Sequence, residues 1–434
     1  MKFHWFNLMP WPDLPEDFRE KHRSVWVDVD SRLYDPVRGH EVYNDYLDQL
    51  EFAADVGFDG IGVNEHHQNA YGMMPSPQLM ASTLARRTSD AAILLLGQSI
   101  AYYNPPTRVA EEMAMIDVIS GGRLIAGFPV GTSMDGNYAV GMNPATLRAR
   151  YQEAHDLIIK AWAEPDVFAW NGKYHKLRYV NIWPRPIQKP RPPVWIPGGG
   201  SIETWDFCAA NGYNYSYLSF SGYLRAEQLM QGFWRRMEEM GQEFNPYQGA
   251  FAQQICVAEN MAEAQRIYEP HVRYFFERCL HVYPGFADAP GYRTEATIRA
   301  GLLSQTDSNI GGGSAQASSM TWDELVERGF IVAGSPDDVA EQFRDLAEKL
   351  RVGHIVCLLH MGNMPMEKTL YNTEMFATKV IPQLRDIWSE YEDHWMPAPL
   401  PAADRATPRA VPGRTIAAGE FSAAPAEAAT AGDD

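Results

Sequence analysis

Two adjacent histidines follow a short apolar stretch early in the chain. Residues 60–64 read Gly-Ile-Gly-Val-Asn and run directly into Glu65, His66 and His67. Because neighbours on an extended segment point to opposite sides, at most one of the two imidazoles faces a common site. A histidine placed there can act as a general acid or base, or can hydrogen-bond a cofactor, since it titrates near neutral pH. Two other interpretations stay open: a metal site, although HExxH spacing is absent, and histidines that only satisfy loop hydrogen bonds.

A glycine-rich turn at residues 197–204 is the second candidate, with the sequence Pro-Gly-Gly-Gly-Ser-Ile-Glu-Thr. Gly199 and Gly200 let a ligand approach the backbone closely, and Ser201 can cap the following helix or donate a hydrogen bond to a phosphate. The exposed amides and the dipole of that helix also favour an anion. Because GxGxxG spacing is absent, a plain tight turn is the alternative.

An anion bound by this chain needs local positive charge, because the formal net charge of the chain is −18. Arg148 and Arg150, followed by Tyr151, stand at the start of a predicted helix and could supply that charge; surface ion pairs are the alternative. Either arginine can face the turn, since the register of the helix can slip by two residues. Gln98, late in a predicted strand, could hydrogen-bond the polar edge of a ring or the core backbone.

Short β-type segments alternate with helix-period segments through residues 1–390, as in a parallel sheet covered by helices. Tyr43, Leu47, Leu50 and Ala54, for example, repeat at helical spacing. Strands are predicted at 3–8, 60–64, 93–99, 123–128, 194–197, 215–218, 252–257 and 354–360. The strand–helix alternation predicts an α/β fold, a (β/α)8 TIM barrel with insertions, whose active-site mouth lies at the carboxyl ends of the strands.

The remaining segments are predicted as additions to one barrel over residues 1–390. An insertion at 164–193, rich in Trp and Pro, is predicted to form a hairpin and an extended return. The long stretch 283–320 contains Gly-Gly-Gly-Ser and is predicted to be a mobile lid. Residues 396–434 are rich in Ala and Pro with almost no large apolar side chains, which predicts a disordered tail.

Composition excludes several classes of protein. A chain with a net charge of −18 and no clustered basic stripe is repelled by nucleic acid and by anionic membrane surfaces. The four cysteines are too far apart for a CxxC pair or a disulfide framework. No signal-peptide pattern is visible, and the longest apolar run, residues 91–96, is far below the ~18 residues that span a bilayer. We therefore expect a cytoplasmic protein.

Several ordered motifs together resemble the bacterial luciferase-like flavin-dependent monooxygenase family over roughly residues 1–390. They are Gly57-Phe58-Asp59 before Glu65-His66-His67, Asn104-Pro105-Pro106, Ser120-Gly121-Gly122-Arg123 through Gly131, Arg150-Tyr151-Gln152-Glu153, the segment from Pro193 to Ser201, and Gly334-Ser335-Pro336. Each motif is weak alone, but their order is specific. Pro129 and Val130 replace the reactive cysteine and the phosphate arginine of luciferases themselves, so light emission is not implied.

The resemblance implies a (β/α)8 barrel that binds FMN, or in a sister branch the deazaflavin F420, at its carboxyl mouth. His66 then corresponds to the active-site histidine near the reactive edge of the flavin, and Gln98 lies under the isoalloxazine ring. The phosphate and ribityl site falls on Gly199, Gly200, Ser201, Tyr151 and either Arg148 or Arg150. An apolar substrate pocket could be lined by Trp5, Phe6, Trp11, Tyr102 and Tyr103, although these could equally be core.

We therefore expect a monooxygenase that oxygenates a small organic substrate with O2 and reduced FMN. No nicotinamide-binding fingerprint is visible, so an NAD(P)H:flavin reductase is the expected partner that supplies the reduced flavin. We also expect a homodimer or homotetramer, and no resident metal. The alternatives are an F420-dependent hydride-transfer oxidoreductase, a metal-dependent barrel hydrolase and a non-catalytic flavin-binding protein.

Overall fold

Eight parallel strands close into a barrel in the computed structural model, which describes residues 1–218, 220–287, 289–295, 299 and 316–406. In chain order the barrel strands are β1 (Lys2–Phe6), β2 (Gly60–Val63), β3 (Ala92–Leu95), β4 (Leu124–Gly127), β7 (Val194–Gly198), β8 (Asn214–Tyr217), β9 (Gly249–Val257) and β11 (His354–Leu358). The pairing of β8 with β9 closes the ring. The predicted (β/α)8 barrel is thereby confirmed.

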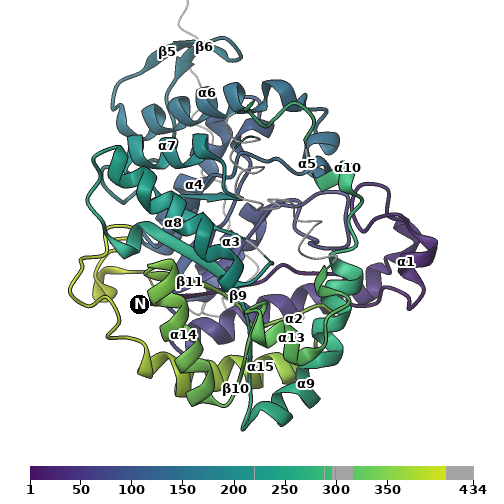
Figure 1. The fold of residues 1–434 in the computed structure, drawn as a ribbon. Helices are drawn as coiled ribbons and strands as arrows, with labels where there is room; N and C mark the ends of the chain where they lie inside the picture. The colour runs from purple at the N-terminus through teal and green to yellow at the C-terminus, as the bar shows by residue number, and fades with distance from the viewer. Residues whose placement is uncertain (219, 288, 296–298, 300–315, 407–434) are drawn as a thin grey trace, which may run out of the picture.

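Helices surround the barrel and follow the predicted units (Figure 1). The longer ones are α2 (Pro36–Asp55), α3 (Pro77–Arg87), α4 (Thr107–Ser120), α6 (Pro144–Ala163), α7 (Ile202–Asn211), α8 (Tyr223–Glu239), α9 (Met261–Tyr274), α14 (Pro336–Leu350) and α15 (Met366–Met375). Shorter helices are α1 (Phe18–Lys21), α5 (Met134–Ala139), α10 (Pro284–Ala287) and α13 (Trp322–Glu327). Local sequence explains their starts: Ser335 caps α14 in a capping box, and Ser201 caps α7.

Side chains on β1 alternate between the outer helices and the barrel axis. The indole Nε1 of Trp5 donates a hydrogen bond to Thr373 Oγ1 on α15 at 3.0 Å, so Trp5 faces outward. His4 faces inward, where its ring lies 5.0 Å from the ring of Trp195 on β7. Of the two interpretations open for Trp5, pocket lining and core, the structure supports core, because alternation places this residue between the sheet and α15.

Extra strands lie outside the closed ring. The insertion at 164–193 contains the antiparallel hairpin β5 (Phe168–Asn171) and β6 (Lys176–Val180), which projects beyond α6 (Figure 1). β10 (Ile331–Gly334) pairs with the last residues of β9, past the end of β8. The predicted lid at 283–320 falls largely on residues 288, 296–298 and 300–315, which lie outside the described residues; its described part includes α10.

The chain just beyond Met396 differs from the predicted disordered tail. The indole of Trp195 donates to the carbonyl oxygen of Trp395 at 2.9 Å, and the amide of Leu400 donates to the carbonyl oxygen of Gly121 at 2.9 Å. These contacts hold the segment across the amino-terminal end of the barrel. Composition misses this, because hydrogen bonds between its backbone and distant residues help to hold the segment in place. Residues 407–434 lie outside the described residues.

Candidate active site

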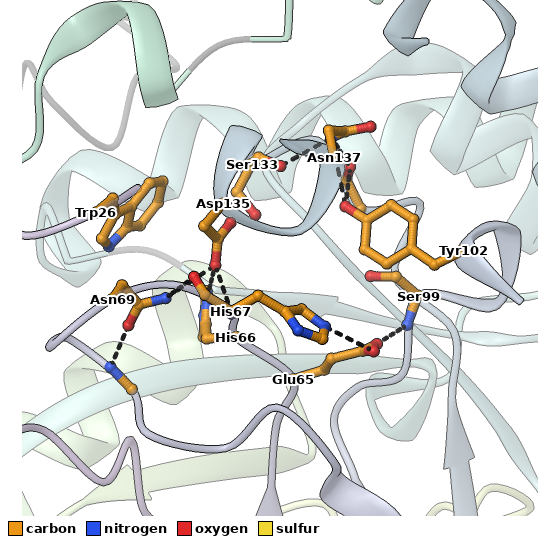
Figure 2. A network of polar contacts seen from close by, with 12 residues as sticks. Trp26, Glu65, His66, His67, Asn69, Ser99, Tyr102, Ser133, Asp135 and Asn137 are labelled. Atoms are coloured by element: carbon orange, nitrogen blue, oxygen red, sulfur yellow. Dashed lines mark hydrogen bonds and ion pairs between the residues drawn. The ribbon is translucent and has the colours of Figure 1, made fainter. Parts of the chain in front are cut away.

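A histidine–aspartate pair stands where the chain leaves β2. The Nδ1 atom of His66 donates a hydrogen bond to Asp135 Oδ2 at 2.8 Å (Figure 2). The same carboxylate oxygen accepts from the backbone amide of His67 at 3.1 Å and from Asn69 Nδ2 at 2.9 Å. Asp135 lies in the first turn of α5 and is 1 % exposed, so a buried carboxylate anchors the whole loop after β2.

The environment of Asp135 keeps it ionised. Burial alone would raise the pKa of this carboxyl, but the charge of His66 and the hydrogen bonds from His66, Ser133 and the His67 amide lower it below its ordinary value. A carboxylate that accepts from Nδ1 fixes the imidazole tautomer and the orientation of the ring. The Nε2 atom of His66 has no hydrogen-bond partner within the described part of the chain. This nitrogen is therefore free to exchange a proton with a ligand.

Aromatic rings enclose His66. The ring of Tyr71 meets the imidazole edge-on at a centroid distance of 4.9 Å, and the indole of Trp26 lies tilted at 5.9 Å. A Cβ atom on Gly72 would stand 3.3 Å from His66 Cδ2, so glycine lets the backbone approach closely here. The histidine side chain keeps 16 % exposure, while Asp135 behind it is almost fully covered. The buried carboxylate of Asp135 thus supports His66, whose own side chain remains partly accessible.

His67 turns to different partners, as strand alternation predicts. Its Nε2 donates to Glu65 Oε1 at 3.1 Å, and the same carboxylate accepts from Tyr103 Oη at 2.9 Å and the Ser99 amide at 2.6 Å. Burial lowers the pKa of His67, but the hydrogen bond and charge of Glu65, with the charge of Asp135, raise it overall. Glu65, His67 and Tyr103 thus form a hydrogen-bonded network that does not include His66.

Gln98 carries two unsatisfied polar atoms just after β3. The side chain is fully buried, and neither Oε1 nor Nε2 has a hydrogen-bond partner among the described residues. Its backbone amide donates to the carbonyl oxygen of Gly127 at 2.9 Å, which fixes the residue beside the end of β4. An unpaired buried amide is costly, so a ligand with complementary donors and acceptors fits this position.

The glycine-rich turn after β7 has the features of an anion cradle. Ser201 caps α7, and its Oγ accepts a hydrogen bond from Arg148 Nη2 at 3.3 Å. Gly200 adopts a φ of +98°, a left-handed conformation that strongly favours glycine. A Cβ on Gly199 would have nothing within 4 Å, so space remains above the turn. The turn, the start of α7 and one guanidinium therefore converge.

The structure separates the two candidate arginines. Arg148 points to Ser201, whereas the guanidinium of Arg150 lies 4.5 Å from the ring centroid of Tyr174, next to β6. The hydroxyl of Tyr151 donates to the carbonyl oxygen of Phe128 at 2.9 Å, so this residue is buried behind the cradle. The structure thus brings Arg148 together with Ser201 and does not bring Arg150 to that turn.

Arg148 has the electrostatics expected of an anion ligand. Within the described residues no carboxylate pairs with its guanidinium, and its buried Nε has no hydrogen-bond partner. A half-buried cation without a counter-charge is unfavourable unless a ligand supplies one. A phosphate group therefore fits the residues present at this turn.

Asp135 is the functional residue that sequence reasoning missed. The loop after the fourth strand carries Thr132, Ser133 and Asp135, so polar residues at a strand's carboxyl end were the available signal. The helix α5 that positions Asp135 has only six residues, so it is too short for helical periodicity to show in the sequence.

Residues 24–353 match the family model described as luciferase-like monooxygenase. Limonene 1,2-monooxygenase of Rhodococcus erythropolis is 25% identical over 349 residues, which cover 77% of this chain and 80% of the relative. The oxygenase component of the flavin-dependent trigonelline monooxygenase of Acinetobacter baylyi is 28% identical over 193 residues, which cover 44% of this chain and 52% of the relative.

Solved structures share the fold. The oxygenating constituent of 3,6-diketocamphane monooxygenase from Pseudomonas putida, solved with FMN, superposes with a TM-score of 0.64 at 18% identity, covering 88% of this chain and 98% of that chain. An F420-dependent secondary alcohol dehydrogenase, solved with an F420–acetone adduct, superposes with a TM-score of 0.61 at 15% identity, covering 89% of this chain and 99% of that chain.

Among the described residues, no helix is long and apolar enough to cross a bilayer, and no group of three or more acidic, histidine or cysteine side chains is arranged to hold a metal.

Proposed function

Because this chain belongs to the luciferase-like monooxygenase family, we propose that it oxygenates a small organic substrate with O2 and reduced FMN. Two relatives named as monooxygenases support this assignment, and the one named as the oxygenase component of a flavin-dependent monooxygenase supports a separate reductase as the source of reduced flavin. The observation that carries the proposal is the His66–Asp135 pair at the barrel mouth that also carries Gln98 and the anion cradle.

In this proposal the cradle holds the phosphate of FMN. Arg148 supplies the counter-charge, Ser201 donates a hydrogen bond, and Gly199 and Gly200 let the phosphate approach the start of α7. Tyr151 supports the cradle from behind, because its ring meets Phe207 of α7 at 5.6 Å. Arg150 remains a second source of positive charge further out, beside the hairpin.

Gln98 and His66 act on the ring portion of the cofactor. The amide of Gln98 offers one donor and one acceptor to a polar ring edge, which would satisfy both of its unpaired atoms. When bound, reduced flavin supplies the two electrons that activate O2, so that one oxygen atom enters the substrate and the other leaves as water. His66 Nε2 delivers or removes the proton that this exchange requires, while Asp135 holds the imidazole in place.

Exclusion of water is the third contribution of the chain. Tyr71 and Trp26 enclose His66 with apolar surface, and Asp135 behind them is 1 % exposed. A dry site strengthens hydrogen bonds to developing charge and limits wasteful release of hydrogen peroxide.

Stopped-flow reoxidation tests the proposal. Chemically reduced FMN is mixed with oxygenated buffer in the presence and absence of a molar excess of the full-length chain. We expect the protein to slow flavin reoxidation and to lower the yield of free peroxide. Reoxidation at the rate seen in buffer, together with tight binding of F420, would instead favour the hydride-transfer alternative, for which the F420-dependent structure shows only a common fold.

A further inference from the structure

A segment far along the chain lies on the anion cradle. Residues 289–295 follow α10, and Gly291 lies against the start of α6, where an added Cβ would be 3.7 Å from Ala145 Cβ. Tyr292 donates its backbone amide to the carbonyl oxygen of Ala289 at 3.2 Å, which forms a turn. This turn carries the Tyr292 side chain to the amino-terminal ends of α6 and α7.

The Tyr292 hydroxyl contacts the guanidinium of the cradle. It hydrogen-bonds to Arg148 Nη2, the same nitrogen that donates to Ser201 Oγ at 3.3 Å. The guanidinium carbon of Arg148 stands 4.8 Å from the centroid of the same ring. Two residues later, the hydroxyl of Thr294 hydrogen-bonds to Glu203 in the first turn of α7. The segment is thus attached to α6 through Arg148 and to α7 through Glu203.

The chemistry of this hydroxyl suits a phosphate ligand. Burial raises the pKa of Tyr292, although the charge of Arg148 opposes the shift, so the phenol stays protonated at neutral pH and can donate. A neutral hydroxyl cannot neutralise the guanidinium that it contacts, so Arg148 still lacks a counter-charge. A phosphate that settles between Arg148 and Ser201 comes within reach of the same hydroxyl.

We propose that Tyr292 is a further phosphate ligand, contributed to the cradle by the segment 289–295. This inference rests on the proposed function, because it takes the anion to be the phosphate of FMN. It also goes beyond that function: the cradle is completed by residues more than ninety positions after Ser201, so phosphate binding and the placement of this segment are coupled.

Tyr292→Phe removes only the hydroxyl, and Tyr283→Phe is the matched control. Tyr283 lies in the same part of the chain, but its ring packs against the guanidinium of Arg23 at 4.9 Å rather than against Arg148. Binding of reduced FMN and reduced riboflavin to each full-length variant is measured by anaerobic equilibrium dialysis, with thermal melting as a check on folding. Riboflavin lacks the phosphate, so it reports on contacts with the ring system and ribityl chain alone.

We expect Tyr292→Phe to weaken FMN binding by about ten-fold or more, as for loss of a hydrogen bond to a charged group, with riboflavin binding unchanged. Tyr283→Phe should change neither affinity. Unaltered FMN affinity in Tyr292→Phe, or equal losses for both flavins, would overturn the role of Tyr292. A wild-type chain that binds FMN no more tightly than riboflavin would overturn the cradle itself, which is a distinct failure of the proposed function.

Discussion

Asp135 Oδ2 lies 2.8 Å from His66 Nδ1, so one buried carboxylate orients a histidine whose Nε2 has no hydrogen-bond partner in the described residues. The carboxylate also accepts from the amide of His67. Orientation of the imidazole and shape of the loop after β2 therefore depend on the same group.

Asp135→Asn should lower kcat while leaving the affinity for reduced FMN unchanged. The asparagine amide can donate to His66 Nδ1, which would move the imidazole proton to Nε2. Nε2 would then be a hydrogen-bond donor instead of an acceptor. A loss of about 10²–10⁴ in kcat is expected for a disabled proton-transfer group. Steady-state kinetics with a reductase, beside anaerobic flavin binding, measures both quantities. A variant with wild-type turnover would remove Asp135 from the mechanism.

His66→Gln and His67→Gln form a matched pair at neighbouring positions. His66→Gln should lower turnover by about 10²–10⁴, because it removes the proton-transfer nitrogen. His67→Gln should retain most of the turnover, since His67 donates to Glu65 and glutamine can still donate there. The yield of hydrogen peroxide per flavin oxidised gives a second readout. Equal losses in the two variants would indicate that the loop, rather than His66, had been damaged.

Arg148→Ala and Arg150→Ala test the assignment of the phosphate arginine. Arg148 contacts Ser201, so its loss should weaken FMN binding by about ten-fold to a hundred-fold, on the scale of a hydrogen bond to a charged group, with little effect on riboflavin. Arg150 lies over Tyr174, so Arg150→Ala should change FMN affinity much less. A larger loss of FMN affinity in Arg150→Ala than in Arg148→Ala, measured by equilibrium dialysis, would assign the phosphate contact to Arg150.

The free energy of unfolding should decrease as the pH falls, because His360, which follows β11, is buried. Burial lowers the pKa of His360 to about 3, whereas an unfolded histidine titrates near 6.5. Between these values the unfolded chain binds the extra proton, so stability is present above pH ~6.5 and decreases as the pH falls, by about 1.4 kcal/mol per pH unit.

His360→Gln should make this dependence shallower by that amount, because glutamine does not titrate. The measurement is urea unfolding between about pH 6.5 and 5, where the histidine term acts. His40→Gln, on the exposed face of α2, is the control and should keep the wild-type slope. An unchanged slope in His360→Gln would show that other groups carry the acid sensitivity.

The barrel and the positions of the candidate residues follow from the sequence because strand alternation and helix periodicity act locally. The assignment between Arg148 and Arg150 does not, since two residues along a helix differ by about 200° in direction and only packing sets the register. Asp135 could not be predicted for a related reason: its helix has only six residues, too few for a repeating apolar pattern to show in the sequence. The attachment of residues after Met396 depends on distant backbone partners such as Gly121, which composition does not encode.

The segment after Trp395 has a practical consequence for handling the protein. Its contacts with Gly121 and, through Arg405, with Asp90 hold it at the amino-terminal ends of β4 and β3, opposite the mouth that carries His66. The described chain therefore ends at Ala406 on the face away from the chemistry. A label or a solid support attached to the exposed residues 401–404 would therefore leave the approach of substrate and oxygen unobstructed.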